Sequence, residues 1–139
     1  MGVVTVTLGA LRGRCDMNRR EGLRSKSNEN WQAARDCEDR LQFNAATSRY
    51  YYSLYEAARF WLDKEGTLQF DVSIRDDLHV TIANIIGTQI AENGRKFREV
   101  LNELKELRVV ADYRVESVDE DEMRKVTEDA VEVRAFFLA

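Results

Sequence analysis

The fold of this chain is decided by residues 44–64, NAATSRYYYSLYEAARFWLDK. The large apolar side chains of this stretch recur at steps of three and four, which places them on one side of an α-helix. They are Tyr51, Leu54, Ala58, Trp61 and Leu62. The pattern predicts a long amphipathic helix that Asn44 opens, that reaches Lys64 and that Gly66 ends as a left-handed cap.

Four further helices are predicted around this one, over about residues 29–40, 75–92, 96–112 and 120–137. Ser27 or Asn28 fits the N-cap of the first of these, and Ser117 with Glu120 fits a capping box for the last. The last helix carries its apolar seam at Met123, Val126, Ala130, Val133 and Phe137. Short connections and the lack of convincing strand pairs predict an all-α fold, an antiparallel up-and-down bundle of about five helices.

Residues 1–25 do not share the helical pattern. We predict a basic, flexible N-terminal leader there, followed by a bundle domain at residues 26–139. The first 26 residues hold six basic side chains against two acidic ones, a net charge of +4. Such a tail can contact phosphate groups, although a solvated and partly disordered leader is the plainer interpretation. The β-branched run Val3–Leu8 could form a short strand, and Met17 is an alternative start of the chain.

The composition fits one globular domain and excludes several classes of protein. The chain has 139 residues, 44% of them hydrophobic, and its net charge of −4 gives no argument for nucleic-acid binding. Cys15 and Cys37 stand alone and His79 is the only histidine, so we predict neither a metal site nor a cofactor. No apolar run reaches the ~20 residues of a membrane span, and we expect a cytoplasmic protein without membrane contact.

Arg49 and the tyrosines that follow it do not fit a purely apolar helix. By helical spacing, Arg49 shares a face with Tyr52 and Glu56. The first interpretation is an arginine that stays in an internal polar groove. The second is a structural ion pair of Arg49 with Glu56 or Asp112.

The end of the fourth predicted helix holds a second polar group. Arg108 and Asp112 are one helical turn apart and can pair, and Tyr113 lies at the helix end, where its hydroxyl can meet water. A guanidinium binds phosphate oxygens bidentately, so an arginine beside a phenol is suited to a phosphate or phosphodiester. The same three residues fit a structural lock at a helix end equally well.

These two groups carry a resemblance to a known family. Residues 44–58, NAATSRYYYSLYEAA, resemble the A-x-x-R-x-Y-Y-x-x-F-x-A-A signature of small HEPN proteins, a nucleic-acid-linked family of prokaryotic defence and toxin–antitoxin systems. Arg108-x-x-Ala111-Asp112-Tyr113 resembles the R-x-x-A-D-Y signature of the same family. His79 falls in the inter-helix region where the family often has a histidine; otherwise a lone histidine at a helix start is a surface residue or a cap. The resemblance covers about residues 28–138.

The resemblance implies an up-and-down bundle that forms a homodimer, with the fourth-helix arginines of two subunits around a shared cleft. It also implies RNA as a ligand and a minimal nucleotidyltransferase as a partner protein. Catalytic members of the family are metal-independent endoribonucleases with a histidine a few residues after that arginine. This sequence has no histidine after residue 79, and free tyrosine titrates near 10, so the usual proton carrier at neutral pH is missing.

We therefore expect an RNA-associated protein of a toxin–antitoxin or nucleotidyltransferase-paired system, with a binding or accessory role rather than strong catalysis. Two alternatives stay open: a metal-independent endoribonuclease toxin with an Arg/Tyr site, and a non-catalytic helical adaptor or dimerisation module. The expected catalytic residues are Arg108, Asp112 and Tyr113. The residues expected at RNA or phosphate are Arg49, Tyr52 and Arg108, with His79 and Glu56 as accessory residues.

Overall fold

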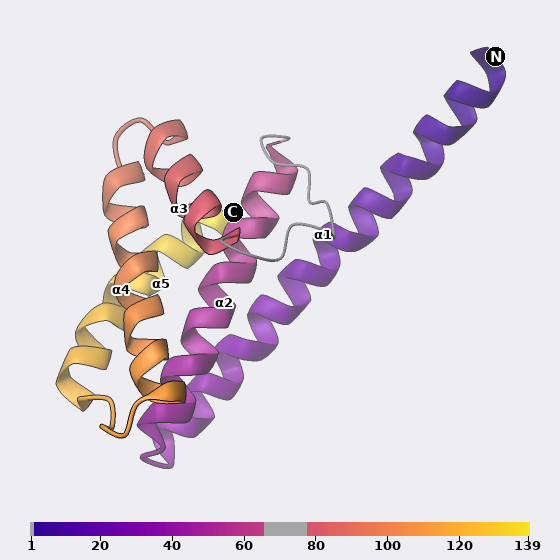
Figure 1. The fold of residues 1–139 in the computed structure, drawn as a ribbon. Coiled ribbons are helices and arrows are strands. Elements are labelled where there is room, and N and C mark those ends of the chain that lie inside the picture. The colour runs from indigo at the N-terminus through magenta and orange to yellow at the C-terminus, as the bar shows by residue number, and fades with distance from the viewer. Residues whose placement is uncertain (1, 66–77) are drawn as a thin grey trace.

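The computed structural model describes the backbone of residues 2–65 and 78–139 and the side chains of residues 18–65 and 79–139. Within those ranges it holds five helices and no strand: α1 (Gly2–Asp39), α2 (Phe43–Lys64), α3 (Leu78–Gln89), α4 (Gly94–Tyr113) and α5 (Glu120–Leu138). The four long helices α1, α2, α4 and α5 alternate in direction (Figure 1). The predicted all-α bundle of about five helices is confirmed.

Helix α2 is the centre of the bundle, because α1, α4 and α5 all pack against it (Figure 1). Buried side chains lie on several sides of α2: Ser53 meets α1, whereas Tyr51 meets α3. Buried residues on several sides of a helix indicate that other helices surround it. The remaining helices supply the rest of the core, including Ile82, Phe97, Leu104, Met123 and Phe137.

Helix α1 corrects two predictions about the start of the chain. Residues Val3–Leu8 lie within its 38 residues, so the predicted short strand is wrong. The predicted helix start at Ser27 is also wrong, because Ser27 lies mid-helix with 0% of its surface exposed. Its hydroxyl donates to the carbonyl of Ser53 on α2 at 2.7 Å, and the Ser53 hydroxyl donates back to the Ser27 carbonyl at 2.7 Å. These hydroxyls join two helices instead of capping one.

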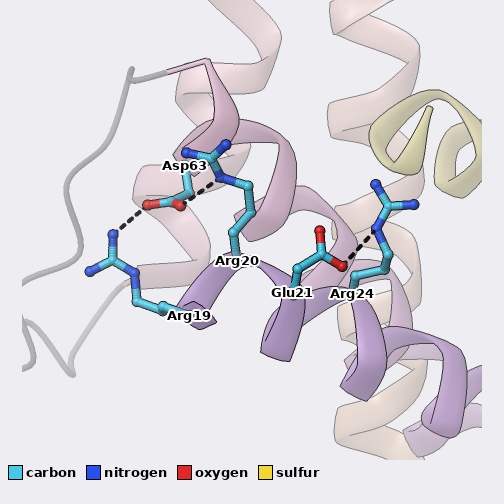
Figure 2. Close-up of polar contacts among 5 residues, drawn as sticks. All are labelled: Arg19, Arg20, Glu21, Arg24 and Asp63. Carbon is cyan, nitrogen blue, oxygen red and sulfur yellow. Dashed lines mark hydrogen bonds and ion pairs between the residues drawn. The ribbon is translucent and has the colours of Figure 1, made fainter. Parts of the chain in front are cut away.

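The segment just before residue 26 packs on the far end of α2. Arg19 and Arg20 both donate to the buried carboxylate of Asp63, at 2.5 and 3.2 Å, from either side (Figure 2). One turn further on, Arg24 lies 3.7 Å from Glu21 (Figure 2). Earlier residues of α1 project away from the other helices (Figure 1). The boundary predicted at residues 25–26 thus falls within an unbroken helix; the division into leader and domain stays a prediction.

The predicted limits of α2 and α4 are correct to within two residues. Helix α4 begins at Gly94, where a Cβ atom would lie 2.6 Å from the carbonyl oxygen of Ile86, so the tight α3–α4 turn requires glycine. The predicted capping box of α5 is wrong, because its N-cap is Asp119, whose side chain accepts from the Glu122 N–H at 2.9 Å. Gly66 and residues 75–77, the expected start of α3, lie outside the described residues.

Asn44 has a different role from the one predicted. Helix α2 begins at Phe43, and the Asn44 side chain accepts a hydrogen bond from the backbone N–H of Val118 at 2.9 Å. This bond ties the first turn of α2 to the α4–α5 connection. Over the ranges that the structure describes, no helix has the length and apolar character that crossing a membrane requires.

Candidate functional site

Arg108 lies where α4 packs on α2, with aromatic rings around its guanidinium. The central carbon of the guanidinium is 4.9, 5.5 and 5.8 Å from the ring centres of Tyr51, Tyr52 and Tyr113. Its Nη1 donates to the Tyr52 hydroxyl at 3.0 Å. Stacking on a ring face stabilises the cation and leaves the edge of the guanidinium able to donate hydrogen bonds. The sequence predicted that Arg108, Tyr52 and Tyr113 belong to one site, and they do lie together.

Asp112 lies beside this guanidinium but does not form a close ion pair with it. Its carboxylate is 3.7 Å from Nη1 of Arg108, and it accepts a short hydrogen bond from the hydroxyl of Ser48 on α2. Over the described part of the chain, Nε and Nη2 of Arg108 have no hydrogen-bond acceptor, although only 16% of the side chain is exposed. The guanidinium therefore keeps unused donor capacity in a partly dehydrated place.

The electrostatics of the site keep the arginine charged and the nearest phenol neutral. Burial alone lowers the pKa of Arg108, but Tyr52, Tyr51 and Tyr113 outweigh that effect and the net shift of the pKa is upward. Burial raises the pKa of Tyr51 well above its ordinary value. At neutral pH the site thus offers a fixed cation that rests on the neutral phenol of Tyr51.

His79 lies behind Tyr51 and is neither a surface residue nor a cap. Its side chain is buried, with 8% of the residue exposed. Nδ1 lies 3.0 Å from the Tyr51 hydroxyl, and Nε2 lies 3.0 Å from Oδ1 of Asn102 on α4. With Oδ1 as the acceptor, Nε2 carries the proton and Nδ1 accepts from Tyr51. Burial lowers the pKa of His79, which agrees with a neutral imidazole.

Arg49 and Glu56 lie at a different place, beside α1. Arg49 donates from Nη1 to Oδ1 of Asn30 at 3.1 Å, and the amide nitrogen of the same Asn30 donates to Glu56 at 3.0 Å. Neither of the ion pairs predicted for Arg49 is formed: the Asn30 amide stands between Arg49 and Glu56, and Asp112 bonds Ser48 and lies beside Arg108. Burial raises the pKa of Glu56. Arg49 and Glu56 thus belong to the α1–α2 contact, whereas Arg108 and its neighbours form the candidate site.

Sequence reasoning missed three residues of the site: Ser48, Tyr51 and Asn102. Ser48 and Tyr51 stand within the quoted signature, but the apolar stripe assigned Tyr51 to the core and gave its hydroxyl no partner. Asn102 lies six residues before Arg108, and its spacing alone carried no signal. A buried tyrosine hydroxyl needs a hydrogen-bond partner, and that rule was the available clue.

A hollow of about 510 Å³ lies on the outer side of the same end of α4. It is lined by Glu106, Val109, Val110, Arg114 and Glu116. Beside it Tyr113 is 72% exposed and Val115 fully exposed. The Arg108 guanidinium does not line this hollow, so the candidate site is the surface between α2 and α4 and not the hollow.

Comparison with family models, curated proteins and solved structures returns no match for this chain. The resemblance to HEPN proteins therefore rests on the two sequence motifs alone and stays a prediction. Among the described residues, no three His, Cys, Asp or Glu side chains are grouped as metal ligands would be.

Proposed function

We propose that this protein binds RNA through the phosphate-binding capacity of Arg108, as a HEPN-like bundle in a toxin–antitoxin or nucleotidyltransferase-paired system. Its role there is binding or accessory. The observation that supports this most is the state of Arg108: its side chain is 16% exposed, its charged guanidinium is seated on tyrosine rings, and over the described residues its Nη2 has no hydrogen-bond acceptor. Phosphodiester oxygens are the acceptors that such a planar fork binds.

The surroundings of Arg108 favour single-stranded RNA over a free phosphate ion. The Tyr52 ring is partly exposed and the Tyr113 ring is 72% exposed, and both lie next to the guanidinium. Bases of single-stranded nucleic acid stack on such rings while their phosphates contact basic groups. An anion without a base would gain nothing from the two tyrosines.

Binding is favoured over cleavage because the candidate site lacks an accessible imidazole. His79 is the only histidine of the chain, and its two ring nitrogens are engaged with Tyr51 and Asn102. General acid–base catalysis near neutral pH is most effective with a group that titrates there, and a missing one costs about 10²–10⁴-fold in rate.

The direct test is binding of a short fluorescein-labelled single-stranded RNA of mixed sequence, measured by fluorescence anisotropy in EDTA. Arg108→Gln is expected to weaken binding about tenfold. The matched control is Arg95→Gln, an exposed arginine of the same helix that pairs with Glu99 at 3.2 Å, and it is expected to change affinity less than about twofold. Equal affinities of the two variants would refute the proposal.

An endoribonuclease with an Arg/Tyr site is the second candidate, and the exposed Tyr113 hydroxyl beside Arg108 is the observation in its favour. The same RNA, incubated in EDTA with the wild type and with Tyr113→Phe, separates the two functions. Cleavage that Tyr113→Phe abolishes would replace the binding role by catalysis. Intact RNA with the wild type would remove this candidate.

The homodimer belongs to the same proposal and uses the exposed end of α4. Val109 and Val110 line the hollow together with Arg114 and Glu116, and Val115, which stands between those two in the chain, is fully exposed. A second copy on this patch would bury its apolar side chains and bring two Arg108 sites close together. The nucleotidyltransferase partner and the cytoplasmic location follow from the resemblance and the composition, and they stay predictions.

A further inference from the structure

A buried chain of hydrogen bonds leads from the Arg108 surface to a second point on α4. The guanidinium rests 4.9 Å above the Tyr51 ring, the Tyr51 hydroxyl meets His79, and His79 meets Asn102. Both bonds to the imidazole are 3.0 Å long. The chain begins and ends on α4 and passes through α2 and α3, so it connects three helices around one arginine.

His79 supplies the hydrogen-bond partner of the buried Tyr51 hydroxyl. Tyr51 is buried, and a buried hydroxyl without a partner costs free energy, so the ring takes the orientation that reaches Nδ1. Tyr55 stacks on His79 with ring centres 6.5 Å apart and limits how far the imidazole can turn. Asn102 fixes the other edge of the ring. An apolar residue at position 79 could fill the space but would leave Tyr51 free to tilt.

We propose that His79 is a positioning residue of the RNA site: through Tyr51 it sets the plane on which the Arg108 guanidinium lies and so directs Nη2 of Arg108 toward a phosphodiester. This inference rests on the proposed RNA binding and adds a residue that does not touch RNA. His79 needs no access to solvent for this role, which agrees with its burial.

The charges around His79 favour the neutral imidazole that this role needs. Tyr51 and Tyr55 face it from α2, and Lys105 and Arg108 act on it from α4. Burial has the largest effect and lowers the pKa of His79; the bond to Asn102 opposes it, and Lys105 and Arg108 each lower the pKa by a smaller amount. A protonated imidazole would present an N–H at Nδ1 and could no longer accept from Tyr51.

The test is a double-mutant cycle with the same labelled single-stranded RNA at neutral pH. His79→Leu is expected to weaken binding about tenfold in the wild type and to add nothing in the Arg108→Gln background. His79→Asn places an oxygen near the position of Nδ1 and is expected to restore most of the affinity. Tyr51→Phe keeps the ring and removes only the hydroxyl, and it is expected to lose as much RNA affinity as His79→Leu. It replaces His79→Leu in the cycle if the latter does not fold.

The matched control is Tyr50→Phe, since the hydroxyl of Tyr50 donates to Glu38 of α1 on another side of α2. It removes the same atom and is expected to leave RNA affinity unchanged. Losses of affinity that add in the double variant, or an equal loss in Tyr50→Phe, would show that His79 acts on the stability of the bundle alone and would overturn the proposal.

A spectroscopic readout separates this proposal from the RNA binding on which it rests. The Nε–Hε resonance of Arg108 in an NMR spectrum reports the environment of the guanidinium without any RNA. Tyr51→Phe and His79→Leu are expected to shift it, whereas Tyr50→Phe is not. A shift without RNA binding by the wild type would remove the RNA function and keep the positioning of Arg108. An unchanged resonance would overturn the positioning role even if RNA binds.

Discussion

A guanidinium that rests on tyrosine rings loses water on its faces but gains few directed hydrogen bonds in return. Arg108 is in this condition, since it bonds Tyr52 and lies only near Asp112. An arginine that served as a structural lock alone would pair closely with its carboxylate. Here Asp112 accepts a hydrogen bond from Ser48 instead, so Arg108 keeps a hydrogen-bond donor for a ligand.

At the residue scale, the single histidine predicts a pH dependence of stability. The pKa of His79 is lowered in the folded protein, so the unfolded chain binds a proton more readily. The contribution of His79 to the free energy of unfolding should be fully present above the ordinary histidine pKa of about 6.5. It should decrease as the pH falls below about 6.5 toward the lowered pKa that His79 has in the folded protein. Urea denaturation of the wild type and of His79→Asn measures this. Their difference in stability should shrink on acidification; parallel curves would contradict it.

The residues of the candidate site were predictable where they share a helix. Arg108, Asp112 and Tyr113 follow from spacing within α4, and Tyr52 follows from the signature in α2. The bond between Tyr51 and His79 was not predictable, because it spans 28 positions and joins two helices. Local periodicity tells which side of a helix is buried but not which neighbour covers it. The same limit produced the wrong ion pairs for Arg49, since nothing placed Asn30 between the charges.

At the scale of the elements, the contact of α1 with the end of α2 depends on one buried carboxylate. Asp63→Asn removes the buried carboxylate that Arg19 and Arg20 share, and the cost in free energy of unfolding is expected to be about 1.5–3 kcal/mol. Trypsin cleavage after the two arginines should accelerate in parallel. The control is Glu21→Gln, which removes an exposed carboxylate one turn away and should change neither quantity. Equal effects of both variants would mean that Asp63 does not hold α1.

The error over α1 has a physical cause. The β-branched residues near its start have strand propensity, and propensity is a weak guide where it conflicts with continuation of a helix. Ser27 looked like a cap because serine often caps, yet its hydroxyl has a partner on α2 that only the folded chain supplies. Helices α2 and α4 were predicted well because their apolar stripes are long, and α5 because its seam is regular.

At the scale of the whole molecule, the exposed apolar end of α4 predicts self-association. Val115→Glu places a charge on the exposed valine that follows α4, between two residues that line the hollow, and is expected to weaken the homodimer at least tenfold without a loss of helical content. Analytical ultracentrifugation measures the association, and circular dichroism measures the fold. Val131→Glu, the same change at a half-exposed valine of α5, is the control. A dimer that Val115→Glu leaves intact, or a wild type that stays monomeric, would contradict the prediction.

The length of α1 gives the molecule an anisotropic shape. A helix of 38 residues is about 57 Å long, whereas a compact chain of 139 residues has a radius of gyration of only about 14 Å. In solution such a body spins quickly about the axis of α1 and turns end over end more slowly. A spectroscopic label on the projecting part of α1 would therefore report the rotation of the bundle and show directly when a large ligand slows it.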